Sequence, residues 1–167
     1  MRSVMIAALA LTWSSFLGAQ ANASSGSPSV QNTPVQAPFD FSAAVPVSGS
    51  WTYSSGNGIS EARFVNASGQ LQLNVRCTIS ARRITISKPA GGPAPFLNLW
   101  SSAQSRSLPA SFLPATATLN ADLSAYDALL DAIVFSRGRI AVGVSGQPAL
   151  VLPAWAEMER VVEDCRA

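Results

Sequence analysis

Apolar and polar side chains alternate along the middle of the chain, which is the pattern of β-strands with one buried face. The clearest example is the segment 70–78, where Leu71, Leu73, Val75 and Cys77 alternate with Gln72, Asn74 and Arg76. Further strands are expected around Trp51 and Tyr53 and at residues 61–65, 84–86, 96–101, 105–108 and 116–119. Turn-forming residues at 56–58 and 66–69 separate the first three strands, so the pattern predicts an antiparallel meander.

Helical spacing of apolar residues is confined to the C-terminal part of the chain. Ser124 and Asp127 resemble a capping arrangement. The apolar positions behind them are Tyr126, Leu129, Leu130, Ile133 and Val134. Gly138 is placed to end this helix, and residues 139–144 and 149–152 read as a hairpin. Pro153 is a natural first residue for a last helix, whose apolar stripe is Trp155, Met158, Val162 and Cys165.

The order of elements is therefore strands, helix, hairpin, helix. This order predicts a β-rich fold (mainly β or α+β), an antiparallel β-sandwich or rolled sheet with two C-terminal-region helices packed on it. Residues 47–167 form a single domain in this interpretation. Residues 24–46 are rich in Ser, Pro, Gln, Asn and Ala without sustained periodicity, which predicts a flexible leader.

The first 23 residues have the pattern of an export signal. Arg2 supplies a positive start, residues 4–17 form a largely apolar run, and cleavage is acceptable after Ala21 or Ala23. The alternative is an uncleaved membrane anchor, but Trp13 and its neighbouring serines interrupt the apolar run. We therefore expect a periplasmic or secreted bacterial protein with no stable membrane insertion after cleavage.

Export changes how the two cysteines are interpreted. An oxidising compartment favours a disulfide between Cys77 and Cys165, which fall on the apolar side of a strand and of a helix. The chain-entropy model assigns such a long-range bridge a stabilisation on the order of 4–5 kcal/mol. Two free thiols, an intermolecular bridge and a redox role remain alternatives, although catalytic dithiols usually lie close together in sequence.

Composition removes several classes of function. Once Arg2 leaves with the signal, ten of the eleven basic side chains and all nine acidic ones remain, and the formal charge of +1 offers no reason to expect nucleic acid as a partner. The chain has no histidine, so triads and metal sites that need imidazole are excluded. Neither a phosphate-binding loop nor a dinucleotide fingerprint is present, and no cofactor or metal is expected.

The arginines are the most interesting polar residues. If Arg82, Arg83, Arg106, Arg137 and Arg139 converge, they form a site for a carboxylate or another anion. The alternative is that they satisfy helix-end carbonyls and solvate sheet edges. Among the strand aromatics, Trp100 is the best candidate for an exposed ligand-binding side chain, because Leu97 and Leu99 take the other face of its strand.

The C-terminal third carries a family resemblance. The runs DALLD at 127–131, RIAV at 139–142 and QPALVLP at 147–153, followed by an amphipathic helix, resemble the end of invasion-associated locus B-like periplasmic proteins. The chain lacks the additional cysteines that those proteins commonly carry. It is more similar to uncharacterised exported bacterial proteins that share FSRGR at 135–139 and EDCR at 163–166. Either resemblance implies a sandwich-like fold in the periplasm, and neither supplies a catalytic residue.

Two classes of function follow. The preferred one is a non-enzymatic module that binds a protein or an envelope component through a sheet face or the arginine-bearing loops. The alternative is a small hydrolase that uses carboxylates such as Asp122 and Asp127, which would have to face each other across a pocket. An inhibitor of an envelope hydrolase is a further alternative, with the Gly- and Pro-rich loop at 91–95 as its contact segment.

Overall fold

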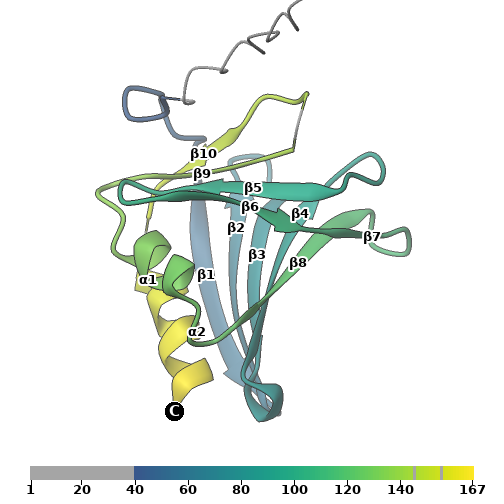
Figure 1. The fold of residues 1–167 in the computed structure, drawn as a ribbon, viewed down its shortest axis with the longest axis vertical. Coiled ribbons are helices and arrows are strands. Elements are labelled where there is room, and N and C mark those ends of the chain that lie inside the picture. Colours follow the sequence, from purple (N-terminus) through teal and green to yellow (C-terminus); the bar gives the residue numbers. More distant parts are fainter. Residues whose placement is uncertain (1–39, 145, 155) are drawn as a thin grey trace, which may run out of the picture. The chain divides into compact units, whose positions relative to one another are not determined.

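The computed structural model describes residues 40–144, 146–154 and 156–167, which belong to one compact unit, Pro38–Ala167. Two antiparallel sheets and two helices make up this unit (Figure 1). The six-stranded sheet contains, in spatial order, β1 (Gly49–Gly56), β2 (Ile59–Asn66), β3 (Leu71–Thr78), β4 (Arg83–Pro89), β8 (Thr118–Ser124) and β7 (Ser111–Leu113). The four-stranded sheet contains β10 (Leu150–Leu152), β9 (Ile140–Gly143), β5 (Phe96–Trp100) and β6 (Ser105–Pro109).

The predicted meander is confirmed in β1 to β4. The β1–β2 connection is a two-residue hairpin in which Asn57 and Gly58 both have positive φ, 52° and 74°. Positive φ at both central positions is the geometry that suits the right-handed twist of paired strands, and Asn-Gly is its preferred sequence. In β3 the side chains of Leu73, Val75 and Cys77 are buried, as their alternation with polar residues predicts.

The two sheets and the helices enclose one apolar core. In Figure 1 the strands of the four-stranded sheet run across those of the six-stranded sheet. The C-terminal helix α2 (Ala156–Arg166) packs on β1, β2 and β3. Leu73 from β3, Leu99 from β5 and Met158 from α2 line the same internal cavity of about 10 Å³, which places the junction of both sheets and α2 at the centre of the core.

The helix boundaries differ from those expected. Helix α1 spans Ala128–Val134, and its N-cap is Asp127, whose side chain accepts a hydrogen bond from the N–H of Leu129. Ser124 instead accepts from the N–H of Tyr126, one step before the helix. Helix α2 begins at Ala156, so Pro153 is not its first residue. The prediction placed both starts about one turn too early, because capping patterns mark a helix start only approximately.

The strands after β4 differ from the prediction as well. The strand expected at 116–119 is β8, which begins at Thr118 and continues to Ser124. The edge strand β7 was not predicted, since three residues are too few to show an alternating pattern. The hairpin strands β9 and β10 are both shorter than expected.

The disulfide between Cys77 and Cys165 is confirmed, and both residues are fully buried. It joins the end of β3 to the last turn of α2 across 88 positions of sequence. Met158, Val161 and Val162 are buried on the same side of α2, as the predicted stripe requires, while Trp155 lies outside the described residues. The Cys165 sulfur lies 3.7 Å from the main-chain oxygen of Arg83, which is a packing contact because an oxidised sulfur carries no proton.

The proposed signal and most of the proposed leader lie outside the described residues. Its last part, residues 40–46, is described, and the following residue, Val47, donates a backbone hydrogen bond to Val151 at the free edge of β10. Within the described ranges, no helix is long and apolar enough to cross a membrane.

Candidate functional site

The five arginines singled out in the sequence do not converge on one site. Arg82 lies just before β4, Arg83 at its start, and Arg106 on β6. Of the five, Arg137 and Arg139 line a common pocket, in the loop between α1 and β9. Arg82 satisfies helix-end carbonyls, as the alternative interpretation proposes, whereas Arg106 pairs with a carboxylate, which neither interpretation expected.

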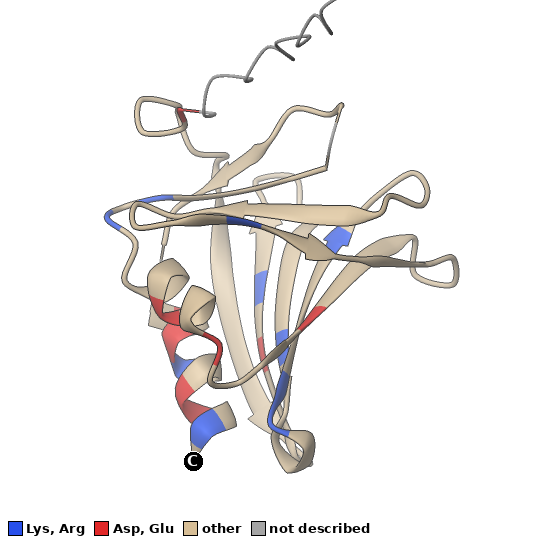
Figure 2. Cartoon of the chain, in the orientation of Figure 1, with Lys and Arg blue, Asp and Glu red and all other residues tan. Residues whose placement is uncertain are grey.

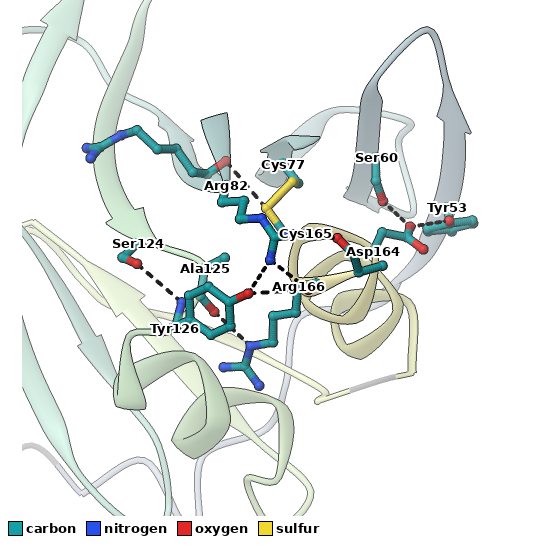
Figure 3. Close-up of a disulfide and its surroundings, with 12 residues drawn as sticks. Tyr53, Ser60, Cys77, Arg82, Ser124, Ala125, Tyr126, Asp164, Cys165 and Arg166 are labelled. Carbon is teal, nitrogen blue, oxygen red and sulfur yellow. Dashed lines mark hydrogen bonds between the residues drawn. A yellow bond between two sulfur atoms is a disulfide. The ribbon is translucent and has the colours of Figure 1, made fainter. Parts of the chain in front are cut away.

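Arg82 holds the end of α2. The backbone of Arg82 adopts a left-handed conformation (φ 48°) that ends a short 3-10 turn. Its guanidinium donates hydrogen bonds to the main-chain oxygens of Arg166 and Ala167 at 2.9 and 3.0 Å. The hydroxyl of Tyr126 accepts a further hydrogen bond from the same group (Figure 3). A cation near the last carbonyls of a helix is favourable because these carbonyls carry partial negative charge. The contact is structural.

Arg106 is paired with the cap of α1. Its Nη2 atom lies 2.7 Å from Oδ1 of Asp127, and the same carboxylate oxygen accepts the N–H of Leu129. Burial, the largest single influence, raises the pKa of Asp127, but the hydrogen bonds from Arg106 and Leu129 and the arginine charge together lower it below its usual value. Asp127 is thus held in its ionised form, which does not suit a general acid at neutral pH.

Arg137 and Arg139 line a pocket of about 350 Å³, which we call the arginine pocket. Its other lining residues are Phe41, Ser42, Pro46, Ser102 and Gly138. The guanidinium of Arg139 donates to the main-chain oxygen of Ser42, so the segment that leads into β1 forms one wall. The guanidinium of Arg137 is exposed and has no hydrogen-bond or ion-pair partner among the described residues.

A set of serine hydrogen bonds fixes the loop that carries these two arginines. Ser136 Oγ accepts the N–H of Ser102 at 2.9 Å and donates to the main-chain oxygen of Arg139 at 2.5 Å. Ser102 Oγ in turn accepts the N–H of Arg137 at 3.0 Å. The α1–β9 loop and the β5–β6 turn are therefore bonded to each other in both directions. Such preorganisation lowers the entropy that binding would otherwise cost.

The residues that line the arginine pocket include two cations and no carboxylate. One carboxylate lies next to the lining, because Asp40 accepts the N–H of Ser42 at 2.9 Å. Figure 2 shows basic residues in the loop before β9, whereas acidic residues gather along α1 and α2. A partly enclosed pocket with two arginines and no carboxylate in its lining is suited to a carboxylate or phosphate, because the guanidinium fork matches both groups.

Trp100 is less exposed than expected. Its side chain is half-buried, and a Cβ atom built on Gly143 of the neighbouring strand would lie 3.2 Å from its ring, so the ring lies close to that strand. Phe96, two pleats along the same face of β5, is 44 % exposed instead. Trp100 lines a shallow pocket of about 140 Å³ with Asn98 and Arg106. Trp100 is half-buried because β9 lies beside β5. The sequence pattern does not show which strands are neighbours, so this burial could not be predicted.

The carboxylates of the hydrolase alternative do not form a pair. Asp122 lies on an outward position of β8 and accepts a hydrogen bond from Thr85 at 2.5 Å, while Asp127 is the cap of α1. Neither residue lines any of the pockets described above. Over the described ranges, no group of three or more His, Cys, Asp or Glu side chains is arranged to hold a metal ion.

Sequence reasoning missed a polar cluster beside the disulfide. Tyr53 and Ser60 each donate a hydrogen bond of 2.5 Å to the same oxygen of Asp164, and Arg160 lies 4.3 Å from the centre of the Tyr53 ring (Figure 3). Ser60 is fully buried and pairs across the sheet with Cys77. A serine at an inward-facing position of β2 was the signal in the sequence that could have indicated this buried polar contact. Because both donors converge on Asp164, we interpret the cluster as a tie between α2 and the sheet.

No family model, curated protein or solved structure matches this chain. The resemblance of the C-terminal third to invasion-associated locus B-like proteins therefore stays a prediction.

Proposed function

We propose that this chain is a non-enzymatic periplasmic module that binds an anionic group of an envelope component in the arginine pocket. The observation that carries the proposal is the pairing of Arg137 and Arg139 on a serine-bonded loop, around a pocket with no carboxylate in its lining. Export by the signal peptide and the family relationship are part of the same proposal.

The enzyme and inhibitor alternatives have less support. A carboxylate-dependent hydrolase needs two acids on opposite sides of a cleft, and Asp122 and Asp127 occupy different surfaces. The 91–95 loop proposed for an inhibitor is tied at both ends by backbone hydrogen bonds, from Ala90 to Ala117 and from Ala110 to Pro95. This anchoring is compatible with a protruding contact loop but supplies no partner.

Titration with simple anions tests the proposal directly. Inorganic phosphate and acetate are added separately to the oxidised protein, and amide chemical shifts are followed by NMR. We expect saturable shifts at Ser102, Arg137 and Gly138, because these residues line the pocket. Loss of both arginines in Arg137→Ala/Arg139→Ala should weaken binding about tenfold or more, since hydrogen bonds to charged groups contribute about 1.5–3 kcal/mol each.

Two control variants separate this site from general charge. Arg63→Ala/Arg83→Ala also removes two exposed cations, but on strands away from the pocket, and should bind as the native protein does. Arg137→Lys/Arg139→Lys keeps the charge and loses the two-pronged geometry, so its affinity should fall between the two. Equal losses in both alanine variants, or no saturable shift with either anion, would reject the arginine pocket.

A further inference from the structure

Another hollow lies on the outer surface of the six-stranded sheet, the surface that faces away from the core, over β3, β4 and β8. We call it the sheet groove; its volume is about 420 Å³, within the range of about 300–1,000 Å³ typical of small-ligand sites. It is lined mostly by polar residues, together with two leucines: Leu71, Asn74, Arg76, Thr78, Thr85, Ser87, Leu113, Thr116, Thr118 and Asn120. None of them belongs to the arginine pocket.

Strand register builds the floor of the groove. Asn74 on β3 pairs with Ser87 on β4, and Ser87 pairs with Asn120 on β8. The next row is formed in the same way by Arg76, Thr85 and Asp122. Because side chains at paired positions emerge on the same face, two rows of short polar groups cross three strands side by side. The three side chains of the first row, Asn74, Ser87 and Asn120, are all partly buried.

Two hydrogen-bond acceptors in this floor lack donors. The oxygens Oδ1 of Asn74 and Asn120 are buried and have no hydrogen-bond partner among the described residues. The amide nitrogen of Asn74 is already used, since it donates to Glu61 at 2.7 Å. Buried side-chain acceptors are normally satisfied, so two unsatisfied oxygens mark this row as incompletely bonded. Asn74 is held by its bond to Glu61, whereas the amide nitrogen of Asn120 is not buried and has no hydrogen-bond partner among the described residues. Rotation of the Asn120 amide about χ2 would exchange its oxygen with this nitrogen and so expose the oxygen to a ligand.

The lining also limits the class of ligand. It carries one cation, Arg76, and two carboxylates border it: Glu61, the cross-strand neighbour of Arg76 on β2, and Asp122 at the end of the second row. This charge is too small for a nucleic-acid track, which needs several cations along the backbone. The hydroxyl and amide side chains accept as well as donate hydrogen bonds. A matching ligand therefore presents many groups that both donate and accept hydrogen bonds, with apolar surfaces between them that can contact the leucines of the lining.

We propose that the sheet groove binds a glycan, a chain of sugar rings whose hydroxyl groups exchange hydrogen bonds with the hydroxyl and amide side chains of the groove, Ser87 and Asn120 among them. The sugar C–H surfaces contact Leu113, which pairs with Thr118 of the groove. An extended peptide fits this surface less well, because peptides that join sheets pair with the backbone of an edge strand, and β3, β4 and β8 are interior strands. The inference stands on the groove alone and does not depend on the arginine pocket.

NMR titration of the oxidised protein tests the glycan proposal. The probes are a hexamer of N-acetylglucosamine, a hexamer of glucose and, as the competing class, an uncharged Gly-Ser peptide. We expect saturable shifts with at least one sugar at the amides of Asn74, Ser87 and Asn120, and none with the peptide. Absence of groove shifts with both sugars, or shifts with the peptide alone, would overturn the proposal.

Matched variants locate the site and separate it from the proposed function. Ser87→Phe places a ring in the middle of the groove and should weaken sugar binding at least tenfold. Thr52→Phe adds the same ring on the same face at the edge strand β1, outside the groove, and should bind sugar normally. Both should keep the native response to phosphate at the arginine pocket, which also reports correct folding. Arg137→Ala/Arg139→Ala should bind sugar unchanged, and equal losses in both ring variants would contradict the glycan site.

Discussion

At the scale of single residues, Asp127 shows how one polar side chain settles a local ambiguity. The sequence predicts a capping arrangement that begins at Ser124 and has Asp127 three residues later, and the structure uses Asp127 itself as the N-cap. Its carboxylate accepts hydrogen bonds from the N–H of Leu129 and from the guanidinium of Arg106, which lies on β6 of the four-stranded sheet. The cap is thus held both by its own helix and by a partner that is 21 positions away in the sequence.

Substitution of Asp127 should lower stability in a pH-dependent way. Asp127→Ala removes an N-cap and an ion pair and should cost about 1–2 kcal/mol at pH 7. Because the folded-state pKa lies below the unfolded value of 3.8, the stabilisation is complete above that value and is lost as the pH falls through the folded pKa. Urea unfolding at pH 7 and pH 3 should therefore show a smaller difference between native and variant protein at pH 3.

Asp127→Asn is the matched control. Asparagine caps helices about as well as aspartate but carries no charge. This variant should lose less stability than Asp127→Ala at pH 7, and its stability should vary less with pH than that of the native protein over the same interval. A difference between Asp127→Ala and native protein that is unchanged at pH 3 would show that the charge of Asp127 contributes nothing.

At the scale of elements, close backbone packing fixes where β1 can lie. A Cβ atom on Gly49 would lie 2.1 Å from the main-chain oxygen of Val65 and 2.7 Å from the ring of Phe64. Gly49 opposes Asn66 at the end of β2, next to an irregularity in the β2–β3 pairing between Phe64 and Val65. The glycine therefore allows the strand to begin against a crowded part of the sheet. In the sequence it looks like any other strand-end glycine.

Two glycines at opposite ends of β1 should respond differently to the same change. Gly49→Ala should destabilise the fold by about 1–3 kcal/mol, the usual cost of forcing extra volume into a packed site. Gly56→Ala adds the same methyl group where no atom lies within 4 Å, and should stay within about 0.5 kcal/mol of the native protein. Thermal and urea unfolding of both variants measure this, and equal costs would contradict the proposed crowding.

At the scale of the whole molecule, the C-terminal helix is held to the sheet by several independent contacts. The disulfide joins α2 to β3, Asp164 accepts hydrogen bonds from β1 and β2, and Arg166 pairs with Asp131 of α1 at 2.7 Å. Arg82 holds the last carbonyls. These contacts surround the fully buried disulfide (Figure 3). Docking of α2 therefore completes the core that the two sheets leave open.

Removal of the disulfide should produce the largest stability loss among these variants. In the chain-entropy model a bridge across 88 positions contributes about 4–5 kcal/mol, and measured values for disulfides are typically about 2–4 kcal/mol. Cys77→Ala/Cys165→Ala should lower the free energy of unfolding by an amount in this range. A reducing agent should destabilise the native protein and leave the double variant unchanged. A loss below about 1 kcal/mol would show that the other contacts of α2 are sufficient.

The fold class, the meander and the disulfide could be predicted because each leaves a local periodic signal. The alternation of Leu73, Val75 and Cys77 identifies β3 and its buried side, and the stripe containing Met158 and Cys165 does the same for α2. The site was predicted less well. Arg137 and Arg139 were identified, but Ser102 and Phe41 of the same pocket were not, because serine and phenylalanine at those positions have no distinctive pattern.

Sequence by itself determined the type of the longer strands and of both helices and which of their sides are apolar, since backbone geometry repeats every two or 3.6 residues, and it determined which two sulfurs can pair. Tertiary structure alone decided which strands are neighbours, and with that every feature that depends on register. The row of Asn74, Ser87 and Asn120 exists because β8 lies beside β4, although β5, β6 and β7 come between them in the sequence. Arg137 and Phe41 line one pocket because the segment before β1 lies against the α1–β9 loop. Such long-range pairing depends on the summed packing of the core, which no local pattern encodes.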